Sequence, residues 1–202
     1  MSRPLICIVG RSGAGKNYIA HRLEMLGYSS VRSYTTRAIR VNDPKDKDTH
    51  IFITPDRVED YKDDIVASTT FNGNFYFSTR KQMNENDIYI LDIAGLRELR
   101  QTYKDKDIVS IFLDCNDEIL KERMTKRGDS EQAIADRIQN DAIMFRDAKK
   151  ECGFVYLNET NEQALDIVKF IDMFIKGYNG KTKIGDTNED NSNCDCNCSF
   201  GD

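Results

Sequence analysis

Residues 5–20, LICIVGRSGAGKNYIA, constrain the fold of this chain more than any other segment. Residues 5–9 are a short unbroken apolar run, which is typical of a strand buried on both faces of a parallel sheet. The pattern G-x-x-x-x-G-K follows directly, from Gly10 to Lys16. Such a loop turns its backbone N–H groups inward around a phosphate, and the helix that follows adds its N-terminal partial positive charge. The segment therefore predicts a phosphate-binding loop between a buried strand and a helix.

The last residues of the loop indicate how a triphosphate is held. We expect Lys16 to reach the β- and γ-phosphates. Asn17 stands where the pattern usually has the Ser or Thr that ligates Mg²⁺, and an amide oxygen can bind a hard cation directly or through water. A plain glycine-rich turn is the alternative, which the flanking strand and helix disfavour. The residues predicted to hold the triphosphate are Gly10, Ser12, Gly13, Ala14, Gly15, Lys16 and Asn17.

Strand-like and helix-like segments alternate along the rest of the chain. Apolar runs predict further buried strands at 88–93, 109–113 and 154–157, and the turn Asn72-Gly73-Asn74 predicts a hairpin of 65–69 with 71–78. Apolar residues at helical spacing predict helices over 17–26, 55–63, 95–103, 117–126, 130–150 and 160–175. This alternation implies an α/β fold with a right-handed parallel sheet.

Length and charge limit what the chain can be. Its 202 residues suffice for one globular domain with an appendage. The formal net charge of −5 argues against non-specific binding of nucleic acid. No apolar run approaches membrane-spanning length, and residues 1–4 are too few for a signal peptide. We therefore expect a cytoplasmic monomer or homodimer, with neither nucleic acid nor a membrane as its partner, in which Cys7 and Cys115 are small buried hydrophobes.

The composition changes after about Lys176. Gly, Asn, Asp, Thr and Ser dominate there, and apolar residues nearly vanish. We expect a globular domain over residues 1–176 and a disordered acidic tail over 177–202, because such a composition cannot bury a core. The tail contains Cys194, Cys196 and Cys198, which could bind a soft metal ion but lack the paired C-x-x-C spacing of a structural zinc site.

A group of hydroxyls and guanidiniums follows the first helix, in Ser33-Tyr34-Thr35-Thr36-Arg37 and Arg40. Two arginines at this spacing suit bidentate binding of one phosphate, although a solvated basic turn explains the group taken alone. The pattern S-Y-T-T-R-x-x-R is followed by HIFI at 50–53, FNGNFYFST at 71–79 and LDI at 91–93. In order and spacing these motifs resemble the guanylate kinase family, from about residue 5 to residue 175.

The resemblance implies a kinase that uses ATP and Mg²⁺ to phosphorylate a nucleoside monophosphate, with GMP or dGMP as the expected acceptor. It also implies a P-loop NTPase-type parallel sheet flanked by helices, with a small acceptor-binding insertion at about 33–80 and a lid at about 123–140. The residues implied for the acceptor are Ser33, Arg37, Arg40, His50 and Tyr76, His50 standing in place of a tyrosine. The implied catalytic residues are Lys16, Arg37, Arg127 and Arg137, and the implied metal-binding residues are Asn17 and Asp92.

Two of these assignments have structural alternatives. Asp92 could organise Mg²⁺ through water, or it could cap the helix that follows its strand. Arg123 lies in the lid region, but it is more simply interpreted as a solvated helix residue.

Two positions depart from the family pattern. The family reads guanine with a glutamate nine residues before Tyr76 and an aspartate two residues after Asp92, where this chain has Ala67 and Ala94. Replacement hydrogen bonds could come from Thr69, Thr70 or Asn72. Two alternatives therefore stay open: a kinase for another phosphorylated small molecule or a modified deoxynucleotide, and a non-catalytic binding module. Such modules usually lose the phosphate loop, which this chain keeps.

Overall fold

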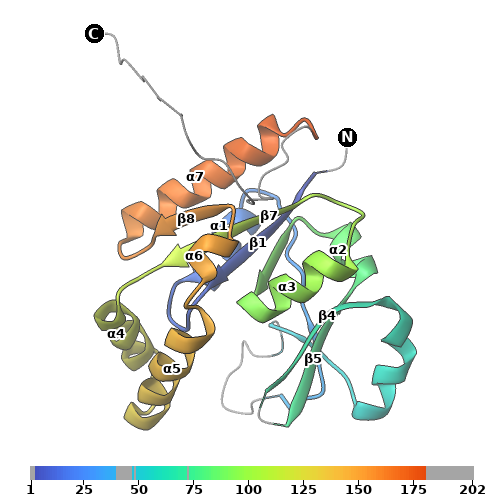
Figure 1. Cartoon of the computed structure of the whole chain (residues 1–202), viewed down its shortest axis with the longest axis horizontal. Coiled ribbons are helices and arrows are strands. Elements are labelled where there is room, and N and C mark those ends of the chain that lie inside the picture. The colour runs from blue at the N-terminus through green and yellow to red at the C-terminus, as the bar shows by residue number, and fades with distance from the viewer. Residues whose placement is uncertain (1–2, 40–46, 48, 72, 181–202) are drawn as a thin grey trace.

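The computed structural model describes residues 3–39, 47, 49–71 and 73–180. Its main sheet has four parallel strands in the order β6-β1-β7-β8 (Figure 1). Their bounds are β1 Leu5–Gly10, β6 Ile88–Leu91, β7 Ile108–Asp114 and β8 Phe154–Leu157. Strand β1 pairs with both β6 and β7, which explains why its apolar run has no polar interruption. The parallel α/β fold predicted from the sequence is confirmed.

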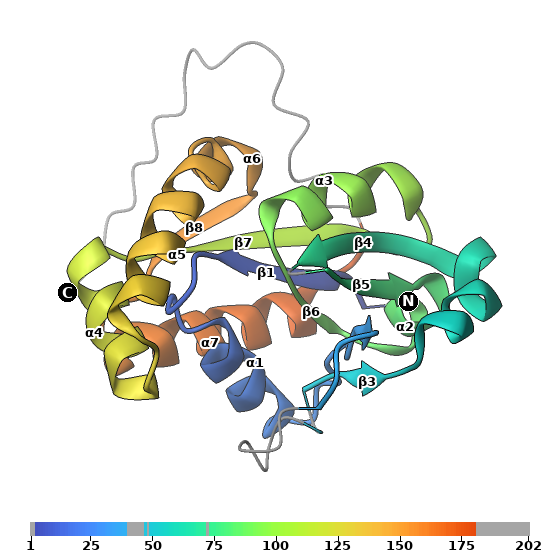
Figure 2. The same cartoon turned by 90° about the horizontal axis from the view of Figure 1, so that it is seen from below.

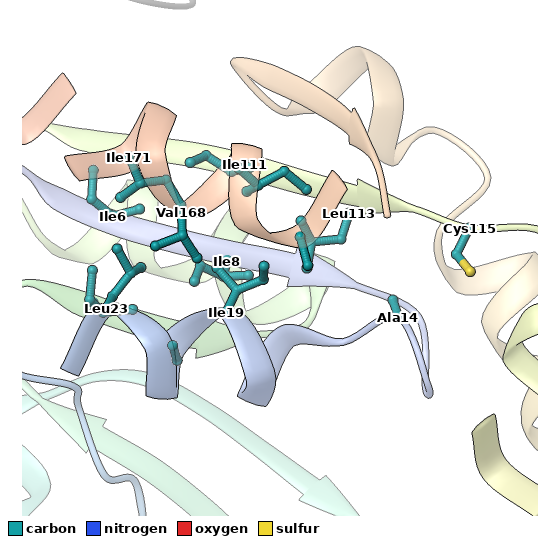
Figure 3. Close-up of a cluster of buried hydrophobic side chains, with 14 of the residues drawn as sticks. Ile6, Ile8, Ala14, Ile19, Leu23, Ile111, Leu113, Cys115, Val168 and Ile171 are labelled. Carbon is teal, nitrogen blue, oxygen red and sulfur yellow. The ribbon is translucent and has the colours of Figure 1, made fainter. Parts of the chain in front are cut away.

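Helices cover both faces of this sheet (Figure 2). Helices α1 (Lys16–Glu24) and α7 (Asn161–Gly177) lie on one face, and α3 (Ile93–Thr102) and α6 (Ala148–Glu151) lie on the other. Alternate residues of β1 belong to two separate hydrophobic cores. Figure 3 shows the core on the α1 side, where Ile8 lies with Ile19 of α1 and Val168 of α7. Both cores depend on β1, so the loop that follows β1 is anchored in the most buried part of the fold.

A smaller sheet, of order β3-β2-β5-β4, forms the insertion. Strand β2 (Tyr34–Thr35) pairs in parallel with β3 (Ile51–Phe52) and antiparallel with β5 (Asn74–Thr79), which in turn pairs with β4 (Ile65–Phe71). The predicted hairpin is therefore confirmed, although Asn72 at its tip lies outside the described residues. A 3-10 helix spans Pro55–Asp64, where a short helix was expected.

The single helix predicted over residues 130–150 is wrong. The chain forms α4 (Asp117–Arg127) and α5 (Glu131–Met144), turns, and then forms the short α6. Phe145 lies at this turn, is buried, and packs against Phe112 of β7 with ring centroids 6.1 Å apart. The break lets Phe145 and Ala148 join the core on the α3 face of the sheet. Neither Gly nor Pro marks the break in the sequence.

The remaining predictions have mixed outcomes. Cys7 and Cys115 are buried and unbridged, as expected. In the part of the chain that the structure describes, no helix has the length and the apolar character needed to cross a membrane. Helix α7 ends at Gly177, and the predicted tail from residue 181 onward, with its three cysteines, lies outside the described residues.

Gly15 is required by both the backbone and the packing of the loop. It lies at the N-cap of α1 with φ +90°, in the left-handed region that favours glycine. A Cβ atom at this position would lie 2.6 Å from Nδ2 of Asn158, which itself donates a 2.7 Å hydrogen bond to the Ala14 carbonyl. A side chain here would therefore break a contact that holds the loop.

We expect Gly15→Ala to destabilise the protein more than Gly27→Ala. Gly27 has φ +93°, but a Cβ atom added there would have no neighbouring atom within 4 Å, so it is a matched control for backbone strain alone. The lost hydrogen bond should make the decrease in the free energy of unfolding roughly 1–3 kcal/mol larger for Gly15→Ala. Urea unfolding of both variants measures the difference. Equal losses would contradict a packing role for Gly15.

Candidate functional site

The loop of residues 10–16 encloses the side chain of Lys16. The Lys16 ammonium donates hydrogen bonds to the carbonyl oxygens of Gly10 (2.5 Å) and Arg11 (3.0 Å). Burial lowers the pKa of Lys16 to about 8; the carboxylates of Asp141 and Asp92 oppose this shift and the guanidinium of Arg127 adds to it. An enclosed ammonium beside a glycine-rich loop is suited to binding a phosphate, which would supply the missing counter-charge.

Arg123 holds the loop from α4, so its interpretation as a solvated residue is wrong. Its guanidinium donates to the carbonyl oxygen of Gly13 at 3.3 Å, and to those of Asn158 and Glu159 at 2.9 and 3.0 Å. These three acceptors belong to the loop and to the segment after β8. Arg123 therefore fixes the loop to the neighbouring strand end, a role that requires tertiary contacts and has no local sequence signal.

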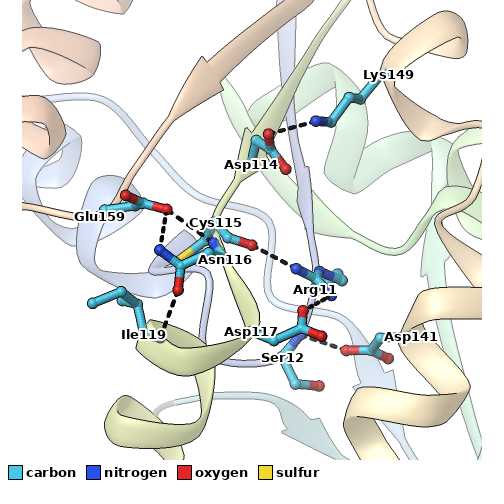
Figure 4. Close-up of polar contacts among 10 residues, drawn as sticks. All are labelled: Arg11, Ser12, Asp114, Cys115, Asn116, Asp117, Ile119, Asp141, Lys149 and Glu159. Carbon is cyan, nitrogen blue, oxygen red and sulfur yellow. Dashed lines mark hydrogen bonds and ion pairs between the residues drawn. The ribbon is translucent and has the colours of Figure 1, made fainter.

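Arg11 joins the loop to the segment after β7 (Figure 4). Its guanidinium donates to the Cys115 carbonyl and pairs with Asp117 Oδ1, at 2.5 and 2.6 Å. The backbone N–H of the next residue, Ser12, donates to Oδ2 of Asp141 at 2.6 Å (Figure 4). The sequence analysis identified neither contact, because both partners come from distant segments.

The two predicted lid arginines share one carboxylate. Arg127 and Arg137 both pair with Oδ2 of Asp129 at 2.5 Å. Asp129 lies between α4 and α5, so the pairs tie the two helices together. Arg127 is also close enough to Lys16 to lower its pKa. The structure thus brings both arginines together, and both are paired with an acid of the chain itself.

A pocket of about 150 Å³ lies where the small sheet meets the ends of β6 and α3. It brings together four of the predicted site residues, Ser33, His50, Tyr76 and Asp92. The rings of His50 and Tyr76 meet edge to face, with centroids 5.6 Å apart. The hydroxyl of Ser33 accepts a 2.9 Å hydrogen bond from that of the buried Ser78.

Arg37 is not among the described residues that line this pocket. Its guanidinium donates to the Ala38 carbonyl at 2.9 Å and lies 5.2 Å from the centroid of the Phe52 ring. The backbone N–H of Arg37 donates a 3.1 Å hydrogen bond to Oγ1 of Thr35. Arg40 lies outside the described residues.

One of the two departures from the family pattern lies at this pocket. Ala67 is buried and lines the pocket, as does Thr69. Ala94 is exposed in the first turn of α3. Tyr89 also lines the pocket, and burial raises its pKa to about 12, so its hydroxyl stays protonated beside Ser78. The sequence analysis missed Tyr89, because a tyrosine within an apolar strand is usually a core residue.

Asp92 lies at the pocket, and its charge also acts on the phosphate loop. Its Oδ1 accepts a 2.7 Å hydrogen bond from the Gly95 N–H, so it caps α3, as one of the two interpretations expected. It also lines the pocket, and its charge raises the pKa of Lys16. The capping bond occupies one carboxylate oxygen and leaves the other available.

The residues expected to hold Mg²⁺ do not form a preformed cage. Asn17 is exposed in the first turn of α1, and Asp92 has one carboxylate oxygen available. Within the described ranges, no group of three or more His, Cys, Asp or Glu side chains could hold a metal ion. Mg²⁺ is commonly held by one or two protein oxygens together with substrate phosphates and water. An exposed amide oxygen and a carboxylate oxygen are of the hard oxygen type that Mg²⁺ prefers.

Comparison with known proteins agrees with this geometry. Residues 6–151 match the family model described as AAA domain. The guanylate kinase of Trichormus variabilis is 32% identical over 181 residues, which cover 83% of this chain and 88% of the relative. The guanylate kinase of Synechococcus sp. is 32% identical over 174 residues, which cover 80% of this chain and 78% of that relative. The crystal structure of guanylate kinase from Anaplasma phagocytophilum has the same fold, with a TM-score of 0.57 at 21% identity over 86% of this chain and 87% of that one. The chain therefore belongs to the guanylate kinase family.

Proposed function

We propose that this protein transfers the γ-phosphoryl group of ATP to the phosphate of a nucleoside monophosphate. GMP or dGMP is the acceptor that family membership favours. We further propose that it acts in the cytoplasm as a monomer or homodimer on this small-molecule substrate, and that residues 1–176 form the catalytic domain.

The meeting of two subsites at Asp92 carries this proposal. Asp92 lines the pocket that contains Ser33, His50 and Tyr76, and its charge acts on Lys16 in the phosphate loop. A donor phosphate on the loop and an acceptor phosphate in the pocket would therefore both lie near this carboxylate. Phosphoryl transfer requires the two phosphates to be neighbours, because the attacking and leaving oxygens must lie roughly in line.

In this proposal the protein acts by positioning and by neutralising charge. Lys16 leaves the Gly10 and Arg11 carbonyls and binds the donor phosphates, while Ser33 and Tyr76 hold the acceptor. Arg127 and Arg137 approach the transferred group as the lid closes, and Arg37 approaches it from the acceptor side. Asn17 and Asp92 would hold Mg²⁺ when it binds with the phosphates, and the ion would supply further neutralisation of charge. The acceptor phosphate is already ionised, so no strong general base is needed.

The alternatives differ in what they require of the site. A binding module has no need for an enclosed lysine beside a glycine-rich loop, and Lys16 with its contacts favours an enzyme. A kinase for another phosphorylated small molecule needs the same loop with a different acceptor pocket. Ala67 at the pocket wall is the observation that supports this second candidate.

A screen of ADP formation across the common ribo- and deoxynucleoside monophosphates tests the function. We expect activity with at least one of them, and Lys16→Ala should lower kcat by at least ~10²-fold, because it removes a charge that stabilises the transition state. Lys169→Ala, at an exposed position of α7, is the matched control and should keep full activity. Absence of ADP formation with every acceptor, or near-normal turnover by a folded Lys16→Ala protein, would contradict the proposal.

We expect the wild-type protein to select weakly among bases, and a pair of carboxylates to increase its preference for guanine. Ala67→Glu with Ala94→Asp should raise kcat/KM for GMP relative to AMP and dTMP by about tenfold or more, since a restored hydrogen-bond acceptor is worth roughly 1–3 kcal/mol. Ala67→Gln with Ala94→Asn has nearly the same size and keeps one acceptor oxygen at each position without the charge, so it should raise this ratio less. Thermal melting checks that both variants fold, because Ala67 is buried.

The wild-type measurement also tests this account of the two alanines. A preference of wild type for GMP over AMP by more than ~10³-fold would mean that another residue reads the base through hydrogen bonds, since sites built to hydrogen-bond a polar group reach such ratios. Equal changes in the Glu/Asp and Gln/Asn variants would show that the charge is not needed at these positions.

A further inference from the structure

Asp141 of α5 occupies a hydrogen-bonding group of the phosphate loop. Its Oδ2 accepts the backbone N–H of Ser12 at 2.6 Å, a short distance typical of a charge-assisted hydrogen bond (Figure 4). Ser12 lies within residues 10–16, whose N–H groups are the donors that such a loop offers to phosphate oxygens. The contact spans 129 residues of sequence and joins the lid region to the loop.

The carboxylate also acts on the lysine of the loop. Among the charges around Lys16, Asp141 has the largest effect that favours the protonated ammonium. Asp141 thus provides an anion to the same N–H group and the same cation that a donor phosphate needs. Two anions cannot share one N–H donor at hydrogen-bonding distance without strong repulsion, so the carboxylate and a phosphate oxygen exclude one another.

The neighbouring residues of α5 have a related arrangement. Arg137 lies one helical turn before Asp141, on the same side of α5, and pairs with Asp129 rather than with the loop. The helix therefore presents an acid to the loop while its arginine is bound to another acid. A shift of α5 that moves Asp141 away from the loop would also move Arg137 relative to the loop, because both residues lie on this helix.

We infer that Asp141 is an internal competitor of the donor phosphates, which holds α5 against the loop until a nucleoside triphosphate displaces it. The inference rests on the proposed function, because it assigns a regulatory contact to the same donor site. The free energy of donor binding is then the gain from binding the phosphates less the cost of breaking the Asp141 contact. Removing the carboxylate should then strengthen donor binding rather than weaken it.

Calorimetric titration of the full chain with a non-hydrolysable ATP analogue in the presence of Mg²⁺ tests the inference. Asp141→Asn keeps the shape and removes the charge, and we expect it to lower Kd by about tenfold, the order of one charge-assisted hydrogen bond. Asp141→Ala removes the acceptor entirely and should lower Kd at least as much. Asp136→Asn, exposed on the same helix, removes an equal charge and should change Kd by less than about twofold, because exposed charges are screened.

The outcomes separate this inference from the proposed function. If wild type binds the analogue and both Asp141 variants bind it equally or more weakly, the inference is wrong and the kinase proposal stands. If wild type does not bind the analogue at millimolar concentration, the kinase proposal itself fails. An equal gain in Asp136→Asn would show a general charge effect and would also overturn the inference. Melting temperatures of the three variants establish that each is folded before binding is compared.

Discussion

The site depends on the hydrogen bonds that hold the carbonyl oxygens of the phosphate loop. Lys16 binds the carbonyls of Gly10 and Arg11, while Arg123 and Asn158 bind those of Gly13 and Ala14. A peptide group whose carbonyl is fixed on one side presents its N–H in a fixed direction on the other, so these bonds orient the donors of the loop. Arg123 and Asn158 come from beyond β7 and β8, which means that the loop takes its shape from the whole sheet.

The same region balances its charges within the chain. Arg127 of α4 and Arg137 of α5 pair with Asp129, and the Ser12 N–H donates to Asp141. Each of these contacts uses a group that the proposed reaction assigns to phosphate. Substrate binding would therefore exchange internal ion pairs and hydrogen bonds for external ones, and the energy of binding would be a difference between the two sets. Asp141 and Arg137 both lie on α5, so this exchange would release contacts that this helix makes.

The sequence predicted those parts of the fold that depend on local pattern. Strand β8 has the predicted bounds, and the loop after β1 lies where G-x-x-x-x-G-K indicates, since both depend on short runs of residues. The break between α5 and α6 could not be predicted, because Phe145 keeps the apolar spacing of a continuous helix while packing on β7. Helix α2 (Arg80–Glu85) was missed despite a local signal, the capping box of Thr79 and Gln82. The contacts of Arg123 and Asp141 depend on tertiary approach alone.

Phosphorus NMR of a mixture of ATP, Mg²⁺, GMP and the full chain tests the central claim most directly, since it identifies the bond that forms. Transfer of the γ-phosphoryl group to the acceptor phosphate predicts that the β-phosphorus signals of ADP and of the new nucleoside diphosphate grow at equal rates while inorganic phosphate stays at its background level. A series of parallel samples with other nucleoside monophosphates extends the measurement to each base. Release of inorganic phosphate without a diphosphate product from any acceptor would contradict the assignment of this site to phosphoryl transfer between nucleotides.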